Sequence, residues 1–105
     1  MLGVVDGAMF EIEKFEFGGR SFMGLKSEIP GGPPLLLVRG EKGLVMCGYL
    51  NLEVAEKLGL AAAIVSGVSS FEDVFGAEVK AATSAARALG VEQGRVVRDV
   101  IHLLG

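Results

Sequence analysis

Cysteine and histidine are almost missing from this sequence, and tryptophan is absent. Cys47 and His102 are the only residues of their kinds among 105, so no disulfide can form within the chain. One thiol, one imidazole and singly scattered carboxylates do not supply the ligands of a zinc site, and we expect no metal. Because disulfides are typical of oxidising compartments, the lone cysteine favours a reducing one.

Positive charge is also scarce, and long apolar runs are missing. Ten Lys and Arg residues stand against 13 Asp and Glu, for a net charge of −3. A basic stripe along nucleic acid is therefore not expected. No apolar run reaches the length of a membrane span, about 18 residues, so we expect no membrane partner. The first residues lack the basic segment of a secretory signal, and we expect a cytoplasmic protein.

Glycine is abundant, but its spacing is not that of a phosphate-binding loop. The chain has 16 glycines, yet the segment Gly40-Glu41-Lys42-Gly43 lacks both the spacing and the following Ser or Thr of such a loop. The Gly-x-Gly-x-x-Gly pattern of dinucleotide-binding domains does not occur either. We therefore expect no cofactor.

The remaining pattern predicts a mixed α/β fold in a single domain covering residues 1–105. Hydrophobic residues make up 50% and charged residues 22%, a composition that excludes a disordered chain. Two β-hairpins come first, then a βαβ unit with parallel strands, then C-terminal helices packed on a mixed sheet. The expected elements are strands at 8–17, 20–29, 35–38 and 44–50, a helix between Asn51 and Gly59, a strand at 60–68, and helices at 70–76, 77–89 and 95–104.

The first hairpin has a definite register, because Gly18-Gly19 fits a two-residue turn. That turn places Phe15 opposite Phe22 and Glu11 opposite Lys26, and the second pair is a favourable cross-strand contact. Both faces of the hairpin are then apolar: one carries Phe15, Phe17 and Phe22, and the other carries Phe10, Ile12, Met23 and Leu25.

An antiparallel hairpin usually has one apolar face, so the second face of this one needs a cover. A C-terminal helix could lie over it, or a bulge near Glu13 and Lys14 could rotate the strand. Alternatively, another subunit covers it, and we favour this interpretation. We therefore predict a homo-oligomer, a dimer or a tetramer, with residues 8–29 as the oligomerisation region and Phe15, Phe17 and Phe22 at the interface.

Cys47 is the residue best placed for chemistry. It ends a predicted central strand just before a helix, and ligands of α/β sheets bind outside the carboxyl ends of strands. A thiolate there could act as a nucleophile, and His102 could serve as its base if the last helix packs beside that strand. The alternatives are a buried core cysteine and a histidine on a solvated helix face.

Several short motifs resemble, in the same order, those of the YunC-like family, a domain of unknown function in bacteria and archaea. The resemblance runs from about Phe22 to the C-terminus. The motifs are Lys42-Gly43, Met46-Cys47-Gly48, Glu56-Lys57-Leu58, Ala62-Ala63-Ile64, Gly67-Val68, Phe71-Glu72-Asp73, and Ala88-Leu89-Gly90-Val91 followed by Gly94.

This resemblance implies a mixed α/β domain whose N-terminal β region mediates tetramer formation. It implies no activity, so no catalytic residue is carried over. After Gly94 the chain departs from the family pattern, which continues with a Met and a second Gly into a Glu-Ala-Leu helix. Here Arg95-Val96-Val97-Arg98-Asp99 follows, so any role of the final helix is open.

Two functions from different classes remain open. The first is an oligomeric binding or structural protein with a small-molecule site between subunits. The second is a small thiol-dependent enzyme that uses Cys47. A buried thiol without a pocket favours the first, and an exposed, reactive thiol beside a cleft favours the second.

Overall fold

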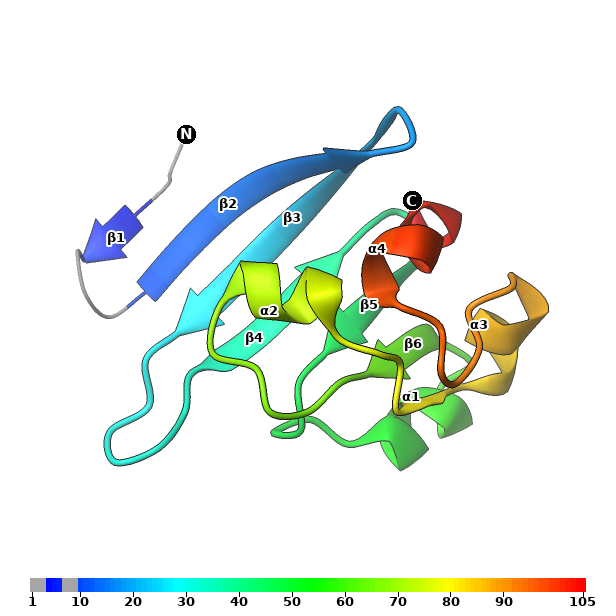
Figure 1. The fold of residues 1–105 in the computed structure, drawn as a ribbon. Helices are drawn as coiled ribbons and strands as arrows, with labels where there is room; N and C mark the ends of the chain where they lie inside the picture. Colours follow the sequence, from blue (N-terminus) through cyan, green and yellow to red (C-terminus); the bar gives the residue numbers. More distant parts are fainter. Residues whose placement is uncertain (1–3, 7–9) are drawn as a thin grey trace.

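The computed structural model describes residues 4–6 and 10–105 and confirms the mixed α/β fold (Figure 1). Within these residues the sheet has seven strands, whose spatial order follows the chain, and only β5 and β6 are parallel. The strands are β1 (Val4–Asp6), β2 (Phe10–Phe17), β3 (Arg20–Ser27), β4 (Leu35–Arg39), β5 (Gly43–Met46), β6 (Ala61–Ile64) and β7 (Ala81–Ala82). The helices are α1 (Leu52–Lys57), α2 (Phe71–Gly76), α3 (Ser84–Ala88), α4 (Val97–Val100) and the 3-10 helix η1 (Ile101–Leu104).

β2 and β3 form the first hairpin in the predicted register. Glu11 lies opposite Lys26, and the pairing continues without a bulge to the turn. Gly18 and Gly19 have φ values of +60° and +78°, the left-handed backbone that a tight hairpin turn requires and that glycine adopts without strain. The predicted strand begins earlier, but residues 8–9 lie outside the described residues.

The second hairpin and the βαβ unit are confirmed, with shorter strands than predicted. β4 and β5 are antiparallel, and β6 lies parallel to β5 after the α1 crossover. The Asn51 side chain accepts a hydrogen bond from the Glu53 N–H at 2.8 Å and so begins α1. Gly59, with φ +74°, follows the end of the helix.

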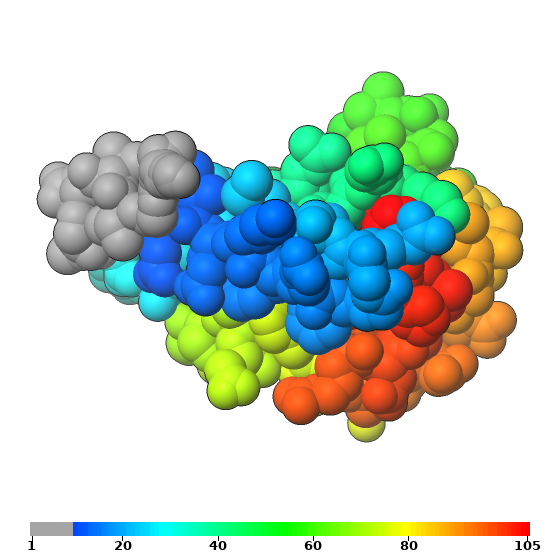
Figure 2. All heavy atoms as spheres, turned by 90° about the horizontal axis from the view of Figure 1, so that it is seen from above, coloured from blue at the N-terminus to red at the C-terminus, as the bar shows by residue number. Residues whose placement is uncertain are grey.

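Each face of the sheet has its own apolar core. The larger core joins β3–β6 to α2, α4 and η1, and the smaller one lies where α1 covers β5 and β6. Figure 2, which looks down on the β2–β3 hairpin, shows α2 and the C-terminal segment on one side and α1 on the other. Fully buried members of the larger core include Leu36, Val38, Val65, Val97, Ile101 and Leu104.

The phenylalanine face of the hairpin is covered by α2 of the same chain. The Phe15 ring lies with its centroid 5.1 Å from that of Phe71 and 4.9 Å from that of Phe75, in edge-to-face contacts. Phe17 packs on Phe75 at 4.8 Å, and Phe22 is only 2% exposed. Of the covers considered for this face, the one observed is a helix of the chain itself. Self-association of the hairpin stays a prediction.

The single helix predicted over 77–89 is wrong. Its first part is β7, antiparallel to β6, and only α3 is helical. The Thr83 N–H donates to Ala62 O at 2.9 Å, so pairing with β6 overrides the helix propensity of the alanines. Thr83 then accepts a hydrogen bond from the Ala86 N–H at 3.2 Å and begins α3 as its N-cap.

The helix predicted over 95–104 is confirmed in two pieces, α4 and η1. It begins only at Val97 because the Val79 N–H donates to Arg95 O at 2.8 Å and the Val97 N–H donates to Ala77 O at 2.9 Å, which holds this stretch extended. Among the described helices, none has the length and apolar character needed to cross a membrane.

The helical spacing of Val54, Ala55 and Leu58 predicts one apolar face for α1, and this prediction needs a correction. Only Ala55 of this helix is buried, whereas Val54 is 50% and Leu58 67% exposed. The small alanine allows α1 to lie close to β5 and β6, and Val54 and Leu58 are largely in solvent.

Candidate functional site

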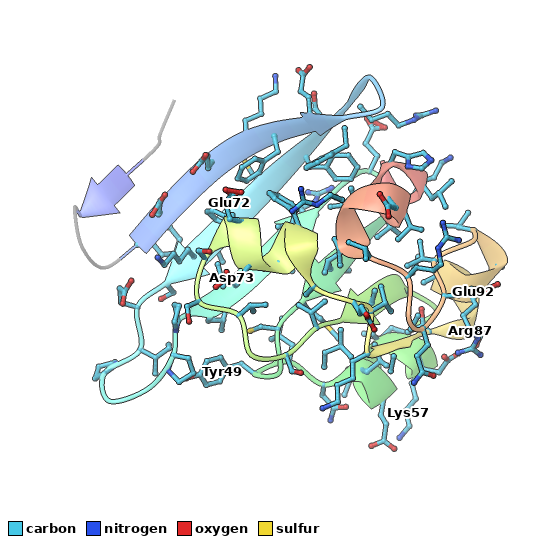
Figure 3. All side chains as sticks on the ribbon, viewed as in Figure 1. Tyr49, Lys57, Glu72, Asp73, Arg87 and Glu92 are labelled. Atoms are coloured by element: carbon cyan, nitrogen blue, oxygen red, sulfur yellow. The ribbon has the colours of Figure 1, made fainter. Side chains whose placement is uncertain are left out.

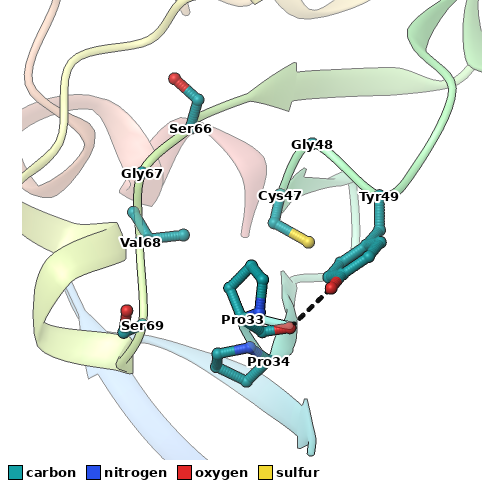
Figure 4. Close-up of a pocket in the computed structure, with 9 residues that line it drawn as sticks. All are labelled: Pro33, Pro34, Cys47, Gly48, Tyr49, Ser66, Gly67, Val68 and Ser69. Atoms are coloured by element: carbon teal, nitrogen blue, oxygen red, sulfur yellow. Dashed lines mark hydrogen bonds between the residues drawn. The ribbon is translucent and has the colours of Figure 1, made fainter. Parts of the chain in front are cut away.

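A cavity of about 470 Å³ lies at the carboxyl ends of the two parallel strands (Figure 4). Three segments meet there: the loop before β4, the turn after β5 and the loop after β6. We call it the Cys47 cavity, and it is lined by Pro33, Pro34, Cys47, Gly48, Tyr49, Ser66, Gly67, Val68 and Ser69. In open α/β sheets this edge is where ligands bind, and the volume is in the range of small-molecule sites.

Cys47 follows β5 directly, and its sulfur takes the place of a backbone acceptor. The Cys47 N–H donates to Leu36 O at 3.1 Å, as in an antiparallel ladder with β4. The return bond would go to Cys47 O, but that carbonyl accepts from the Leu50 N–H in the turn. The Leu36 N–H donates instead to Cys47 Sγ at 3.3 Å. The thiol therefore satisfies a buried donor that the ladder leaves open.

The thiol lines the cavity but is hardly accessible from it. Cys47 is 4% exposed, and within the described residues the structure shows no group of three metal-binding side chains. Its burial opposes attack on a bulky substrate. The structure thus gives Cys47 two roles: its side chain lines the cavity, and its sulfur accepts a hydrogen bond from β4.

Tyr49 spans the mouth of the cavity. Its hydroxyl donates to Pro33 O at 2.7 Å, so it links the turn after β5 to the loop before β4 (Figures 3 and 4). A Cβ at Gly32 would lie 2.9 Å from the Tyr49 oxygen. The side chain is 46% exposed, so its ring separates the cavity from solvent on that side.

The loop after β6 lines the cavity and carries backbone donors. Gly67 has φ +70°, and the loop ends where the Ser69 N–H donates to Asp73 Oδ2 at 3.0 Å. Within residues 4–6 and 10–105, the N–H groups of Ser66, Gly67 and Val68 find no acceptor in the chain. Val68 is only 6% exposed, and an unpaired donor in a buried residue is uncommon. Ser66 and Gly67 are exposed, so their N–H groups are open to water or to a ligand.

Charged side chains are absent from the described lining of the Cys47 cavity: none of its nine residues is Lys, Arg, His, Asp or Glu. A smaller hollow on the other side of the same loop shares Ser66, Gly67 and Val68 and adds the carboxylates of Glu72 and Asp73. The local field is thus neutral to negative, which disfavours a strongly anionic ligand.

His102 does not accompany Cys47, so the condition for pairing the two is not met, and the exposed histidine matches the alternative of a solvated helix face. A Cβ at Gly18 would lie 2.9 Å from His102 Cβ, so the histidine sits at the turn of the first hairpin. The η1 helix closes that end of the sheet, where the Lys42 N–H donates to Leu104 O at 2.9 Å. The Cys47 cavity is at the opposite end.

Sequence reasoning identified Cys47 but missed Tyr49, the prolines and the loop after β6. The predicted strand at 60–68 included Ser66 and Gly67, whereas β6 ends at Ile64. A Ser-Gly pair directly after a short apolar strand of a βαβ unit is the signal that could have indicated a binding loop.

Comparisons with known proteins agree with the resemblance found in the sequence. A family model described as a domain of unknown function (DUF1805) matches residues 46–104. The chain is similar to a crystal structure of a protein of unknown function, TA1206, from Thermoplasma acidophilum. The two are 40% identical with a TM-score of 0.89, over 98% of this chain and 100% of that chain. No curated protein matched the chain.

Proposed function

Because the chain belongs to the DUF1805 family, a domain of unknown function, we propose its function from its own geometry. We propose a self-associating protein that binds a small molecule in the Cys47 cavity. The supporting observation is that three segments distant in sequence converge on one cavity at the carboxyl ends of parallel strands. A site between subunits was expected from the sequence, but this cavity is built by one chain.

Binding can be tested with reporters that the sequence places in the cavity. Tyr49 is the only tyrosine and the chain has no tryptophan, so tyrosine fluorescence reports on the cavity mouth alone. We expect hits from a fragment library to change this fluorescence and to shift the backbone amide signals of the loop after β6. A library without a hit at these residues would refute the binding function.

A matched pair of variants shows whether a hit occupies the cavity. A Cβ at Gly48 meets nothing within 4 Å, so a side chain can begin there, and we expect Gly48→Leu to fill part of the cavity. We expect Gly48→Leu to abolish binding and Gly48→Ala to retain it. Equal binding by both variants would place the ligand elsewhere.

The second part of the proposal, self-association, rests on the outer face of the first hairpin. Ile12, Leu25 and Leu37 lie in one row across β2, β3 and β4, on the face opposite the phenylalanines. Beside this row Met23 is 48% exposed. α1 covers this face only over β5 and β6. An apolar sheet face of this kind is typical of an interface.

Light scattering after size exclusion tests self-association. We expect the wild type to exceed the monomer mass of 11.0 kDa, and Met23→Lys to lower the mass by placing a charge in the apolar face. Ser21→Lys adds the same charge near the turn of the same strand and should have little effect. A wild type that is monomeric at micromolar concentration would end this part of the proposal.

A thiol-dependent enzyme remains the second candidate, because Cys47 lines the cavity and accepts the Leu36 N–H. A catalytic thiolate would react with iodoacetamide faster in the native protein than in the denatured one. With the thiol 4% exposed, we expect the reverse order. Rapid native alkylation that is blocked in Gly48→Leu would favour the enzyme.

A further inference from the structure

We infer that the ligand of the Cys47 cavity is an uncharged carbonyl compound with an apolar body, an inference that rests on the proposed binding function. The argument concerns which ligand chemistry the lining can satisfy. The lining offers apolar surface, a few hydroxyls and free backbone donors, but no charged side chain among the described residues.

The hydrogen-bond donors of the lining belong to the loop after β6. Within the described part of the chain, no acceptor is present for the N–H groups of three consecutive residues, Ser66, Gly67 and Val68. Gly67 is in the left-handed conformation at φ +70°, and a turn with such a residue can present successive N–H groups to one acceptor. A ligand carbonyl, with two lone pairs, matches these donors.

The charge of the ligand follows from what surrounds these donors. A phosphate or other multiple anion is usually held by Arg, Lys or a metal ion, and the lining contains neither Arg nor Lys. Glu72 and Asp73 lie behind the same loop and would repel an anion. Asp73 also accepts the Ser69 N–H, which keeps its carboxylate close. A neutral acceptor avoids this repulsion.

The apolar side chains of the lining indicate that most of the ligand is apolar. Pro33, Pro34 and Val68 present aliphatic surface, and the Tyr49 ring closes one side (Figure 4). Among the hydroxyls of the described lining, that of Tyr49 alone has a partner in the chain: it donates to Pro33 O. A flat or branched apolar group fits against these side chains, with its carbonyl toward the loop after β6.

Three probes with the same phenyl body test the class: benzamide, benzoate and phenyl phosphate. The full chain, labelled with nitrogen-15, is titrated with each while the amide signals of Ser66, Gly67 and Val68 are followed. We expect benzamide to shift these signals and to bind at least about tenfold more tightly than phenyl phosphate, because an anion here would be desolvated without a cationic partner. Gly48→Leu should abolish the benzamide shifts, and Gly48→Ala should retain them.

Tighter binding of benzoate or phenyl phosphate at the same amides would overturn the inference while leaving the proposed binding function intact. Failure of all three probes, with fragment hits of another class at these amides, would also overturn only the inference. Failure of the probes and of the fragment library together would remove both.

Discussion

Glycines in the turns at the two ends of the sheet can have opposite surroundings. At the closed end, which carries the 18–19 and 40–43 turns, a Cβ on Gly40 would lie 2.5 Å from Leu104 O and 2.6 Å from Phe22 Cε2. At the open end, which carries the Cys47 cavity, a Cβ on Gly48 or Gly67 would meet nothing within 4 Å. The C-terminus fills the closed end, whereas loops alone surround the open one.

We therefore expect the closed end to contribute most to stability and the open end to carry the proposed binding site. Close packing at the closed end makes each side chain there sensitive to added or lost atoms. The open end is assembled from turns that leave donors and space unused, and such loops on a rigid scaffold are where function is usually found. Substitutions at the closed end should therefore change the free energy of unfolding most.

The largest effect is expected at Thr83, a buried residue of the closed end whose hydroxyl makes three hydrogen bonds. Its Oγ1 accepts from the Ala62 N–H at 3.0 Å and from the Ala86 N–H at 3.2 Å, and it donates to Leu60 O at 2.7 Å. Thr83→Val keeps the shape but removes all three bonds, so we expect a loss of about 2–4 kcal/mol of unfolding free energy.

Urea denaturation at one protein concentration measures this loss, since the proposed self-association would make stability depend on concentration. Thr83→Ser is the control: it keeps the hydroxyl and should lose clearly less. Equal losses in the two variants would mean that the methyl group, and not the hydrogen bonds, stabilises this site.

The next largest effect is expected when a glycine at each end is replaced by alanine and the two changes in stability are compared. Gly40→Ala pushes a methyl group into backbone and ring atoms and should lose about 1–3 kcal/mol through overpacking. Gly48→Ala places it in open space at a position whose φ is not left-handed, so stability should stay within about 0.5 kcal/mol. Thermal unfolding of the pair tests the contrast, and similar shifts would remove the distinction between the ends.

Much of the fold could be predicted from local signals, and the errors arose where distant segments decide. Gly18-Gly19 and the alternating pattern determine the first hairpin, because turn type and period are local properties. The alanines of 81–82 are compatible with either helix or strand, and pairing with β6 selects the strand. Which segment covers Phe15 could not be predicted either, because the contacts come from Phe71 and Phe75 of α2, which are distant in the sequence.

The site could be predicted only in part for the same reason. Cys47 stands out by its place after a strand, but the cavity exists only once loops some 15 to 20 residues apart come together, as Pro33, Tyr49 and Gly67 do. At Cys47 the sulfur replaces the carbonyl as the acceptor of the Leu36 N–H, because the carbonyl already accepts the Leu50 N–H of the following turn. No sequence pattern predicts this replacement.

Cys47→Ala tests the hydrogen bond from the Leu36 N–H to the Cys47 sulfur at the open end. The substitution leaves the Leu36 N–H without its acceptor in a residue that is fully buried, so we expect a loss of about 1–2 kcal/mol of unfolding free energy. Cys47→Ser keeps an acceptor and should recover part of it. Amide hydrogen exchange at Leu36 should accelerate in the alanine variant alone; unchanged exchange would mean that the sulfur does not hold this N–H.

The smallest effect should come from Glu56, which links α1 to α3 beside the closed end. The Ser84 hydroxyl, and after it the Ser84 N–H at 2.8 Å, donate to the Glu56 carboxylate and lower its pKa from the ordinary 4.5. A lowered carboxylate pKa contributes stability that is fully present above the unfolded value and is lost as pH falls through the folded one. Wild type should therefore exceed Glu56→Gln in unfolding midpoint at neutral pH, and the gap should close only below about pH 4.5. Glu41→Gln, an exposed carboxylate of the 40–43 turn, is the control and should follow the wild type throughout. A gap that widens on acidification would show that Ser84 does not stabilise the ionised form.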